Sequence, residues 1–400
     1  MFKKFIIISL PLFLVSSILR AGGWDIYLMG TRALSMATAF TGVADDPSAI
    51  FYNPAGLVYQ NYSLSFSVEG VYLMPVHSYT LPTGTTVYSK YRNTLPQVFL
   101  SYKKDKWSFG FGAYVSYGGG GIDWSREELD LPLKAILGVY SFTPTVAYQL
   151  NDKLSLGFNL NIYYGKMEVN IETLDTGKMT TDETGTSYSA GFGILYRPNK
   201  KIGIGLTIRG PAKMKLAGST TMNIMELPLN FDSESKFNLP LNIDVGLSYH
   251  LRENFLISGD VGYTRWSTLQ KLEGTIKNVP VAPGIIMDVD KSEEINFQDI
   301  FKFKIGGEYV FPQGVALRVG FAYDNYARPD STLSVRDIDV DKIVLFGGIG
   351  YRIGKAEINF AGLYALGKER QITETSMGFP LVHKYNLDAT VISLGVRYSF

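Results

Sequence analysis

The chain has 400 residues, of which 46% are apolar, 14% aromatic and 19% charged, and it contains no Cys. Its mean hydropathy of +0.05 is too low for a helical membrane protein, yet so small a charged fraction is unusual in a soluble protein. The near balance of 38 basic and 37 acidic residues argues against nucleic acid as a partner. A transmembrane β-barrel fits this composition, because half of each strand faces lipid and half faces water.

The first residues have the features of a secretory signal peptide. Lys3 and Lys4 precede an apolar run over 5–19, which is shorter than a membrane-spanning helix. We expect cleavage roughly between Ser17 and Gly22 and assign 1–21 to the signal peptide. No later apolar run reaches the ~18 residues that a transmembrane helix requires, and the absence of Cys fits an exported protein without disulfides.

Alternation of apolar and polar residues runs through the rest of the chain. In 62–72, Leu64, Phe66 and Val68 share one face of a strand while serines share the other. This pattern predicts 14 strands, an even number typical of bacterial single-chain barrels. The segments are 62–74, 92–103, 106–117, 136–149, 154–170, 185–197, 201–215, 237–250, 254–266, 299–311, 314–323, 341–353, 356–366 and 386–400.

The connections between these strands predict two different rims. Short turns alternate with longer loops, as at the periplasmic and extracellular ends of an outer-membrane barrel. A soluble β-sandwich is disfavoured, because sandwiches run to roughly 100 residues with similar loops at both ends. Phe400 closes the last strand and resembles the assembly signal of outer-membrane proteins. The expected partners therefore include the barrel assembly machinery and the lipid and lipopolysaccharide of that membrane. The short turns lie at 104–105, 151–152, 198–200, 251–253, 312–313 and 354–355.

Residues 30–57, GTRALSMATAFTGVADDPSAIFYNPAGL, resemble the N-terminal hatch of the FadL family of long-chain fatty-acid and hydrocarbon transporters. Further similarity follows in SAGFGILYRPNKKIGIGL, LPLNIDVGLSYHLRENFLISGDVGYTRWSTL and FKIGGEYVFPQGVALRVGFAYDNYARP. The resemblance implies an all-β fold, a 14-stranded antiparallel transmembrane β-barrel over 61–400 with an N-terminal hatch over 22–60. It also implies transport of long-chain fatty acids or other hydrophobic small molecules. Related barrels that serve protein secretion or surface attachment share the hatch, so that function is the alternative.

The hatch motif has a physical rationale, because side chains alone do not fill a barrel of this width. Asp45 or Asp46, ahead of Pro47, is expected to cap a short helix. Asn53–Pro54 is typical of a turn. The resemblance implies that Asn53, Pro54, Ala55 and Gly56 form the gate. Alternatively, they only end a helical turn and connect the plug to the first strand.

A glycine run marks a second point of interest, since glycine within a strand often accompanies a bulge or bend. In the FadL family the third strand carries an inward kink that opens a lateral hole in the wall. The resemblance makes Gly118, Gly119 and Gly120 candidates for this opening. The alternative is an extracellular loop beginning at Gly118. A nucleotide-binding function is excluded, because no strand-to-helix unit follows the glycines.

Cargo binding requires an apolar pocket with a few polar groups. Residues 122–137 are expected to form a short amphipathic helix at the outer mouth, where family members capture their ligands. On the strand near 299–311, alternation turns alternate side chains into the lumen, and cations there could hold a carboxylate. The alternative is a solvated lumen in which Glu308 neutralises Arg318. The ligand-binding candidates are Trp124, Leu129, Leu133, Lys302, Lys304 and Arg318.

The sequence gives little support to an enzyme, a cofactor or a metal site. His77, His250 and His383 are far apart in the predicted topology, and no Gly-x-Ser-x-Gly or His-x-x-x-His motif is present. A general porin is a further possibility that a plugged lumen would exclude. We therefore expect a non-enzymatic protein of the outer membrane of a Gram-negative-type bacterium, without catalytic residues, cofactor or metal.

Overall fold

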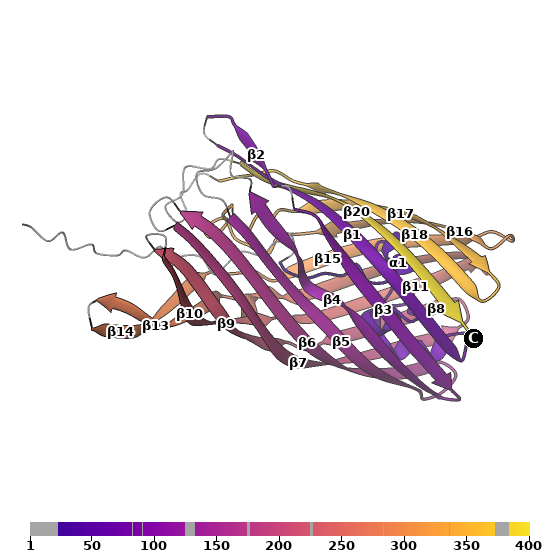
Figure 1. The fold of residues 1–400 in the computed structure, drawn as a ribbon. Helices are drawn as coiled ribbons and strands as arrows, with labels where there is room; N and C mark the ends of the chain where they lie inside the picture. The colour runs from indigo at the N-terminus through magenta and orange to yellow at the C-terminus, as the bar shows by residue number, and fades with distance from the viewer. Residues whose placement is uncertain are drawn as a thin grey trace, which may run out of the picture.

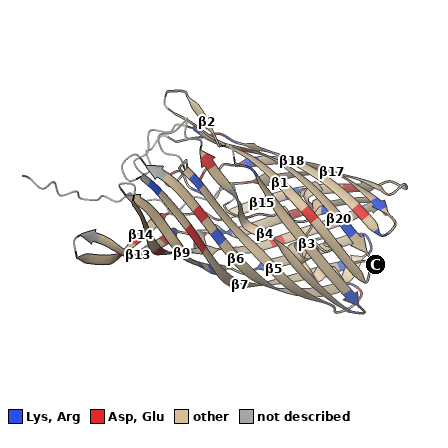
Figure 2. Ribbon diagram, viewed as in Figure 1, with Lys and Arg blue, Asp and Glu red and all other residues tan. Residues whose placement is uncertain are grey.

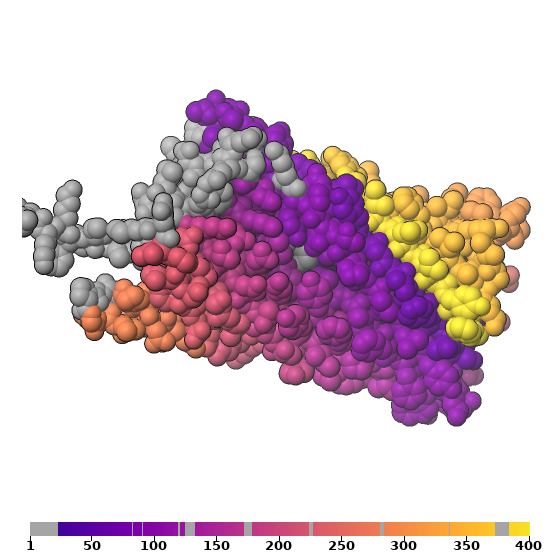
Figure 3. All heavy atoms as spheres, viewed as in Figure 1, coloured from indigo at the N-terminus to yellow at the C-terminus, as the bar shows by residue number. Residues whose placement is uncertain are grey.

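The computed structural model describes residues 23–81, 83–89, 91–124, 133–173, 177–224, 227–282, 284–335, 337–372 and 384–400. These residues form a closed antiparallel β-barrel with 14 wall strands (Figure 1). The last strand pairs with the first over Ser65↔Ser399 to Thr80↔Lys384, and in the space-filling view the two lie side by side (Figure 3). The predicted fold class and strand number are confirmed. The predicted signal peptide lies outside the described residues.

The wall is built from ten continuous strands and four that are interrupted. The continuous strands are β1 (Leu64–Thr80), β3 (Asn93–Lys104), β4 (Trp107–Trp124), β5 (Leu133–Gln149), β6 (Leu154–Thr173), β7 (Gly177–Asn199), β16 (Val315–Asp324), β17 (Lys342–Ile353), β18 (Ala356–Gly367) and β20 (Lys384–Ser399). The interrupted ones are β8 (Ile202–Arg209) with β9 (Ala212–Ile224), β10 (Leu227–Leu239) with β11 (Leu241–Arg252), β12 (Phe255–Arg265) with β13 (Lys271–Ala282), and β14 (Ile285–Glu294) with β15 (Ile300–Val310). The short β2 (Thr86–Tyr88) pairs with β1, and β19 (Arg370–Gln371) pairs with β20. The 3-10 helix η2 (Trp266–Thr268) lies between β12 and β13.

The two faces of the wall follow the predicted alternation. On β15, Phe301, Phe303 and Ile305 are about half exposed on the outer face, whereas Lys302 and Lys304 are buried inside. Apolar side chains on the outer face are stable because they meet lipid rather than water. Most wall residues carry no charge (Figure 2). Among the described residues, no helix is long and apolar enough to cross a membrane.

The six short turns are confirmed, but several predicted loops are wrong. At the opposite rim β7, β9 and β10 continue well beyond the predicted strand ends, and β13 and β14 form a protruding hairpin (Figure 1). Residues 227–230 of β10 are all exposed, and we infer that these extensions stand outside the bilayer, where neither face needs to be apolar. Without lipid to face, they lose the alternation from which strands are predicted. The sequence pattern therefore marks the membrane-embedded part of each strand.

The segment 23–60 lies inside the barrel and is almost wholly buried. It contains α1 (Thr31–Ser35), α2 (Ala49–Tyr52) and the 3-10 helix η1 (Pro54–Tyr59). Hydrogen bonds join it to strands around the ring, from Gln97 on β3 to Thr207 on β8 and Asp260 on β12. The lumen is therefore filled by the start of the chain, which we call the plug.

Candidate functional site

The turn at Asn53 is fixed by its own side chain. Asn53 is fully buried, and its amide nitrogen donates to the carbonyl of Thr41 at 3.0 Å and to that of Ile194 on β7 at 2.9 Å. Its side-chain oxygen accepts from the backbone N–H of Ala55, which caps η1 ahead of Pro54. The predicted turn is thus present. One asparagine joins two parts of the plug to the wall.

Glycines in three neighbouring strands make room for this turn. A Cβ on Gly193 would lie 2.3 Å from the Asn53 side-chain oxygen, and one on Gly157 would lie 2.3 Å from the backbone nitrogen of Ala55. On β8, a Cβ on Gly205 would lie 2.0 Å from the carbonyl of Thr41. Each distance is far below van der Waals contact, so only glycine fits. We call Gly157, Gly193 and Gly205 the glycine notch.

Wall side chains also hold the carboxyl end of α2, whose carbonyls lack partners within the helix. Asn159 donates to the carbonyl of Ile50 at 3.0 Å, Thr207 to that of Tyr52 at 2.8 Å, and Arg209 to that of Phe51 at 3.3 Å. At the amino end of α2, the prediction that Asp45 or Asp46 is the capping residue is wrong. Ser48 is the N-cap residue, and Asp46 accepts hydrogen bonds from the backbone N–H and hydroxyl of Ser48.

An ion-pair network anchors the plug near the periplasmic rim. Arg32 of the plug donates to Asp45 at 2.5 Å and to Glu308 of β15 at 2.8–2.9 Å. Arg318 donates to the same Glu308 at 2.6 Å and lies 3.5 Å from Glu357. The expected neutralisation of Arg318 by Glu308 is therefore present. Pairing of this kind offsets the cost of removing the charges from water.

The two predicted lysines are also paired. Lys302 contacts Asp25 at 2.5 Å, and Lys304 lies 3.9 Å from Asp244. Both ammonium groups flank the ring of Tyr27, at 4.7 and 5.0 Å from its centroid. Arg318 lies opposite Glu308 on β15, and Glu308 is four residues, or roughly 13 Å of strand, away from Lys304. The prediction that Lys302, Lys304 and Arg318 form one free anion site is therefore wrong.

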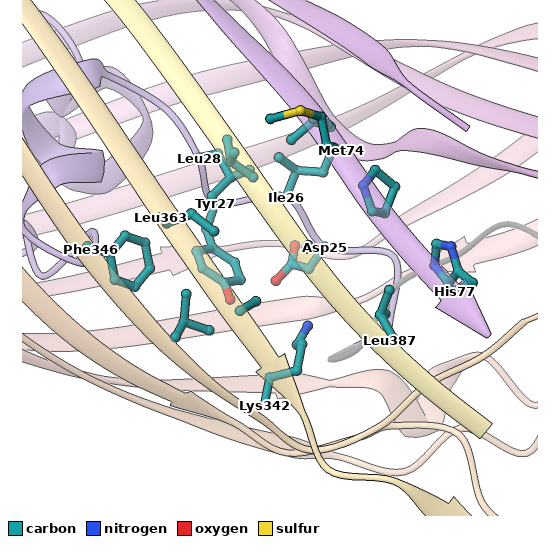
Figure 4. Close-up of a pocket in the computed structure, with 16 residues that line it drawn as sticks. Asp25, Ile26, Tyr27, Leu28, Met74, His77, Lys342, Phe346, Leu363 and Leu387 are labelled. Carbon is teal, nitrogen blue, oxygen red and sulfur yellow. The ribbon is translucent and has the colours of Figure 1, made fainter. Parts of the chain in front are cut away.

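An apolar cavity lies between the plug and the wall. Its volume is ≈ 90 Å³, and its floor is residues 25–28 of the plug. The labelled side chains Phe346, Leu363 and Leu387 lie around it together with Tyr27, while Asp25, His77 and Lys342 add polar groups (Figure 4). The hydroxyl of Tyr27 donates to Asp324. The remaining walls are Leu73, Met74, Pro75, Val344, Ala365, Ala389 and Val391.

The wall pairing is interrupted between β3 and β4. The ladder between these strands ends at Val98↔Ala113, although β4 runs on to Trp124 beside β5. Bulges occur at Val115/Tyr117 and Gly118/Gly120, and Gly118 has a φ of +67°. The freed edge of β4 instead pairs with the plug, because Ile26 donates to the carbonyl of Ser116 and Gly118 to that of Trp24. The alternative of a loop beginning at Gly118 is therefore wrong. Gly119 and Gly120 also lie within β4.

The expected amphipathic helix over 122–137 is wrong where this range is described. Trp124 ends β4 and Leu133 begins β5, and the two are paired. Both are buried in the apolar cluster at the extracellular end, where the Trp124 ring nitrogen donates to the carbonyl of Val335. Leu129 lies outside the described residues. His77 and His250 lie at opposite ends of the barrel wall, in β1 and β11, and His383 is outside the described part.

Several important residues escaped prediction from the sequence. Tyr27 and Asp25 precede the recognised motif, and Arg209 is a single charge within an ordinary strand pattern. The glycine notch has a detectable signal, because glycine recurs at inward-facing positions of consecutive strands. Such glycines indicate close approach of another backbone. No group of three His, Asp or Glu suited to a metal occurs in the described part of the chain.

A plugged barrel with short turns at one rim defines an outer-membrane transport architecture. The chain belongs to the family of outer membrane protein transport proteins (OMPP1/FadL/TodX), whose model matches residues 12–400. The long-chain fatty acid transport protein of Escherichia coli is 23% identical, with 90% of each chain covered. A FadL homologue from Pseudomonas aeruginosa has a similar fold, with a TM-score of 0.82, 18% identity, and coverage of 94% of this chain and 100% of that one. The toluene transporter TbuX of Ralstonia pickettii also has a similar fold, with a TM-score of 0.74 and 18% sequence identity. The match covers 93% of this chain and 98% of that one. The protein resides in the outer membrane of a Gram-negative-type bacterium.

Proposed function

We propose that the protein takes up long-chain fatty acids or other hydrophobic small molecules by passive diffusion. The ligand is captured at the extracellular end and passes into the apolar cavity. The plug then rearranges around Asn53–Gly56, and the ligand leaves sideways between β3 and β4. Related proteins named for fatty-acid and toluene transport support this class of cargo.

The observation that carries the proposal is the shared lining of the cavity. Residues 25–28 of the plug form one side, and apolar side chains of β1, β17, β18 and β20 form the other. The cavity of ≈ 90 Å³ is smaller than the ~150 Å³ cavity that holds benzene in an engineered protein. A larger ligand therefore enters only if residues 25–28 move. Ligand binding is in this way coupled to the plug.

The unpaired stretch of β3 and β4 supports lateral exit. An unpaired strand edge facing lipid would be unstable, and here plug residues 24–26 satisfy the β4 edge. Displacement of this segment by ligand would release the edge at the level of Gly118. Residues 25 and 26 of the plug thus both line the cavity and cover the proposed exit.

An apolar cavity favours transport over the alternative in protein secretion or surface attachment, for which a filled barrel with partner-binding loops is expected. A plugged lumen also argues against a general porin. The family consists of transport proteins, which agrees with a function without catalysis.

The test is uptake of labelled oleate by Gram-negative cells that lack their own transporter. We expect the intact protein to restore uptake, and a form lacking Asn53, Pro54 and Ala55 to fail at equal surface expression. Asn53→Ala should also reduce uptake, whereas Asn230→Ala on the exposed β10 should not. No uptake by a correctly inserted intact barrel would refute the fatty-acid proposal.

A further inference from the structure

Arg209 is the last residue of β8 and is only 7% exposed. Six basic residues in the described part of the chain are less than about a tenth exposed. Five of them have a carboxylate oxygen within 4 Å, namely Lys302, Lys304, Arg318, Arg328 and Arg370. Among the described residues, no carboxylate oxygen lies that close to the guanidinium of Arg209. Among these six described residues, Arg209 is therefore the buried cation without a carboxylate in direct contact, although Asp25 and Asp244 lie near enough to interact with it electrostatically.

The contacts of Arg209 leave most of its hydrogen-bonding capacity unused. A guanidinium carries five N–H donors, and within the described part of the chain Arg209 makes one hydrogen bond, to the carbonyl of Phe51 at 3.3 Å. This distance is long for a bond from a charged donor. The guanidinium also lies over the Phe51 ring, 4.2 Å from its centroid. A carboxylate offers far better geometry, because it accepts two parallel N–H bonds from arginine.

Arg209 also contacts the part of the plug that leads into the Asn53 turn. Phe51 is two residues before Asn53, and its carbonyl is one of three at the end of α2 that wall side chains hold. Asn242 faces Arg209 on β11 and donates to the hydroxyl of Tyr117, which lies at the bulge of β4. Arg209 therefore lies between the bulge of β4 and the α2 clamp, by which we mean the three hydrogen bonds from Asn159, Thr207 and Arg209 to the carbonyls at the end of α2.

We propose that Arg209 recognises the anionic head of a carboxylate ligand and couples its arrival to release of the plug, an inference that rests on the proposed function. A carboxylate that binds the guanidinium competes with the Phe51 carbonyl for the same donors. Its binding breaks one of the three clamps on α2 and loosens the turn at Asn53. A neutral ligand of equal length also displaces residues 25–28 when it enters the apolar cavity, but it leaves the hydrogen bond from Arg209 to α2 intact.

The plug offers a close control in Arg197 of β7. Arg197 likewise donates to one plug carbonyl, that of Val43, and lies over a plug aromatic ring, that of Tyr59 at 4.2 Å. Arg197 borders a second cavity, lined near the periplasmic turns by residues such as Asp152, Lys200 and His250, and among the described residues it makes no hydrogen bond to the end of α2. Arg197→Gln and Arg209→Gln thus remove the same kind of plug contact at two different places.

The experiment measures binding of oleate and of oleyl alcohol to the purified full-length barrel in detergent. Arg209→Gln should weaken oleate binding by about ten-fold and leave oleyl alcohol binding within about two-fold. Arg209→Lys keeps the charge and should retain part of the preference for oleate. Arg197→Gln should leave the preference unchanged. Equal losses for both ligands, or an unchanged preference in Arg209→Gln, would overturn the role of Arg209 while leaving the proposed function intact. An intact protein that binds neither ligand would overturn both.

Release of the plug is followed separately. Because the chain has no Cys, a single Val58→Cys substitution at a buried plug position reports on opening through its rate of maleimide labelling. Oleate should accelerate labelling when Arg209 is present and should not when it is replaced by Gln, and oleyl alcohol should have little effect in either background. Acceleration by oleate that persists in Arg209→Gln would contradict the coupling.

Discussion

The side-chain oxygen of Asn53 lies only 2.3 Å from the position that a Cβ on Gly193 would occupy. The plug turn therefore fits into the wall only because β7 has no side chain at this point. Gly157 and Gly205 extend the same relationship to β6 and β8. The glycine notch of the wall and the Asn53 turn of the plug therefore pack directly against each other.

Gly193→Ala should displace the turn without preventing barrel formation. The added methyl group would overlap the Asn53 side chain, and overpacking of this kind typically costs about 1–3 kcal/mol. We expect faster maleimide labelling of the Val58→Cys reporter in the absence of ligand. Gly70→Ala is the matched control, because a Cβ there meets nothing within 4 Å. Equal labelling in the two variants would show that the notch does not hold the plug.

The sequence predicted the membrane-embedded fold well, because lipid imposes a strict alternation on strands such as β15. It could not predict the extracellular hairpins. At the tip of β14, Ile285, Ile286 and Met287 are all exposed, so apolar and polar residues do not alternate between two faces there. For the site, the Asn53 turn was predictable from local chemistry. The pairing of Arg318 with Glu308 was predictable as an alternative, because the two face each other on neighbouring wall strands. The partner of Lys302 was not, since Asp25 reaches it only through folding of the plug into the lumen.

Gly118→Ala should impair transport through the wall. Gly118 has a φ of +67°, and a Cβ there would lie 2.3 Å from the carbonyl of Leu137. Placing alanine in this conformation costs about 1–3 kcal/mol, so we expect the bulge to shift and β4 to move toward pairing with β3. Oleate uptake should fall at equal surface expression.

The control for this variant is Gly84→Ala, which also has a positive φ, of +89°, but lies in open space. It tests backbone strain away from the interrupted ladder. Undiminished uptake by Gly118→Ala would argue against exit at this bulge, and equal impairment by Gly84→Ala would point to general misfolding.

The extracellular segment 325–341 should become less stable as the pH rises toward neutrality. Asp339 is fully buried and accepts hydrogen bonds from the backbone N–H groups of Ala327 and Arg328. Burial, reinforced by nearby Asp337, raises the pKa of Asp339 from 3.8 to about 7, although Lys342 and the backbone bonds oppose the shift. Between these values the folded segment keeps a proton that the unfolded one has lost. Stability therefore falls as the pH rises through this window and levels off above about 7.

Hydrogen exchange of the Ala327 and Arg328 amides, corrected for intrinsic exchange rates, measures this effect. Protection should be greater at about pH 5.5 than at about pH 8. Asp339→Asn cannot ionise and should show protection that is independent of pH over the same range. A pH dependence that survives in Asp339→Asn would assign the effect to another group.

Leu363→Trp should block the apolar cavity. Leu363 lines it from β18 opposite plug residues 25–28 (Figure 4), and the larger indole would occupy space that the ligand needs. We expect binding of both oleate and oleyl alcohol to fall by about ten-fold or more, because the effect concerns the apolar tail rather than the head group. Leu366→Trp, on the same strand but 45% exposed on the lipid face, should bind normally. Normal binding by Leu363→Trp would place the ligand elsewhere in the lumen, whereas loss of oleate binding alone would indicate that the substitution disturbs head-group recognition.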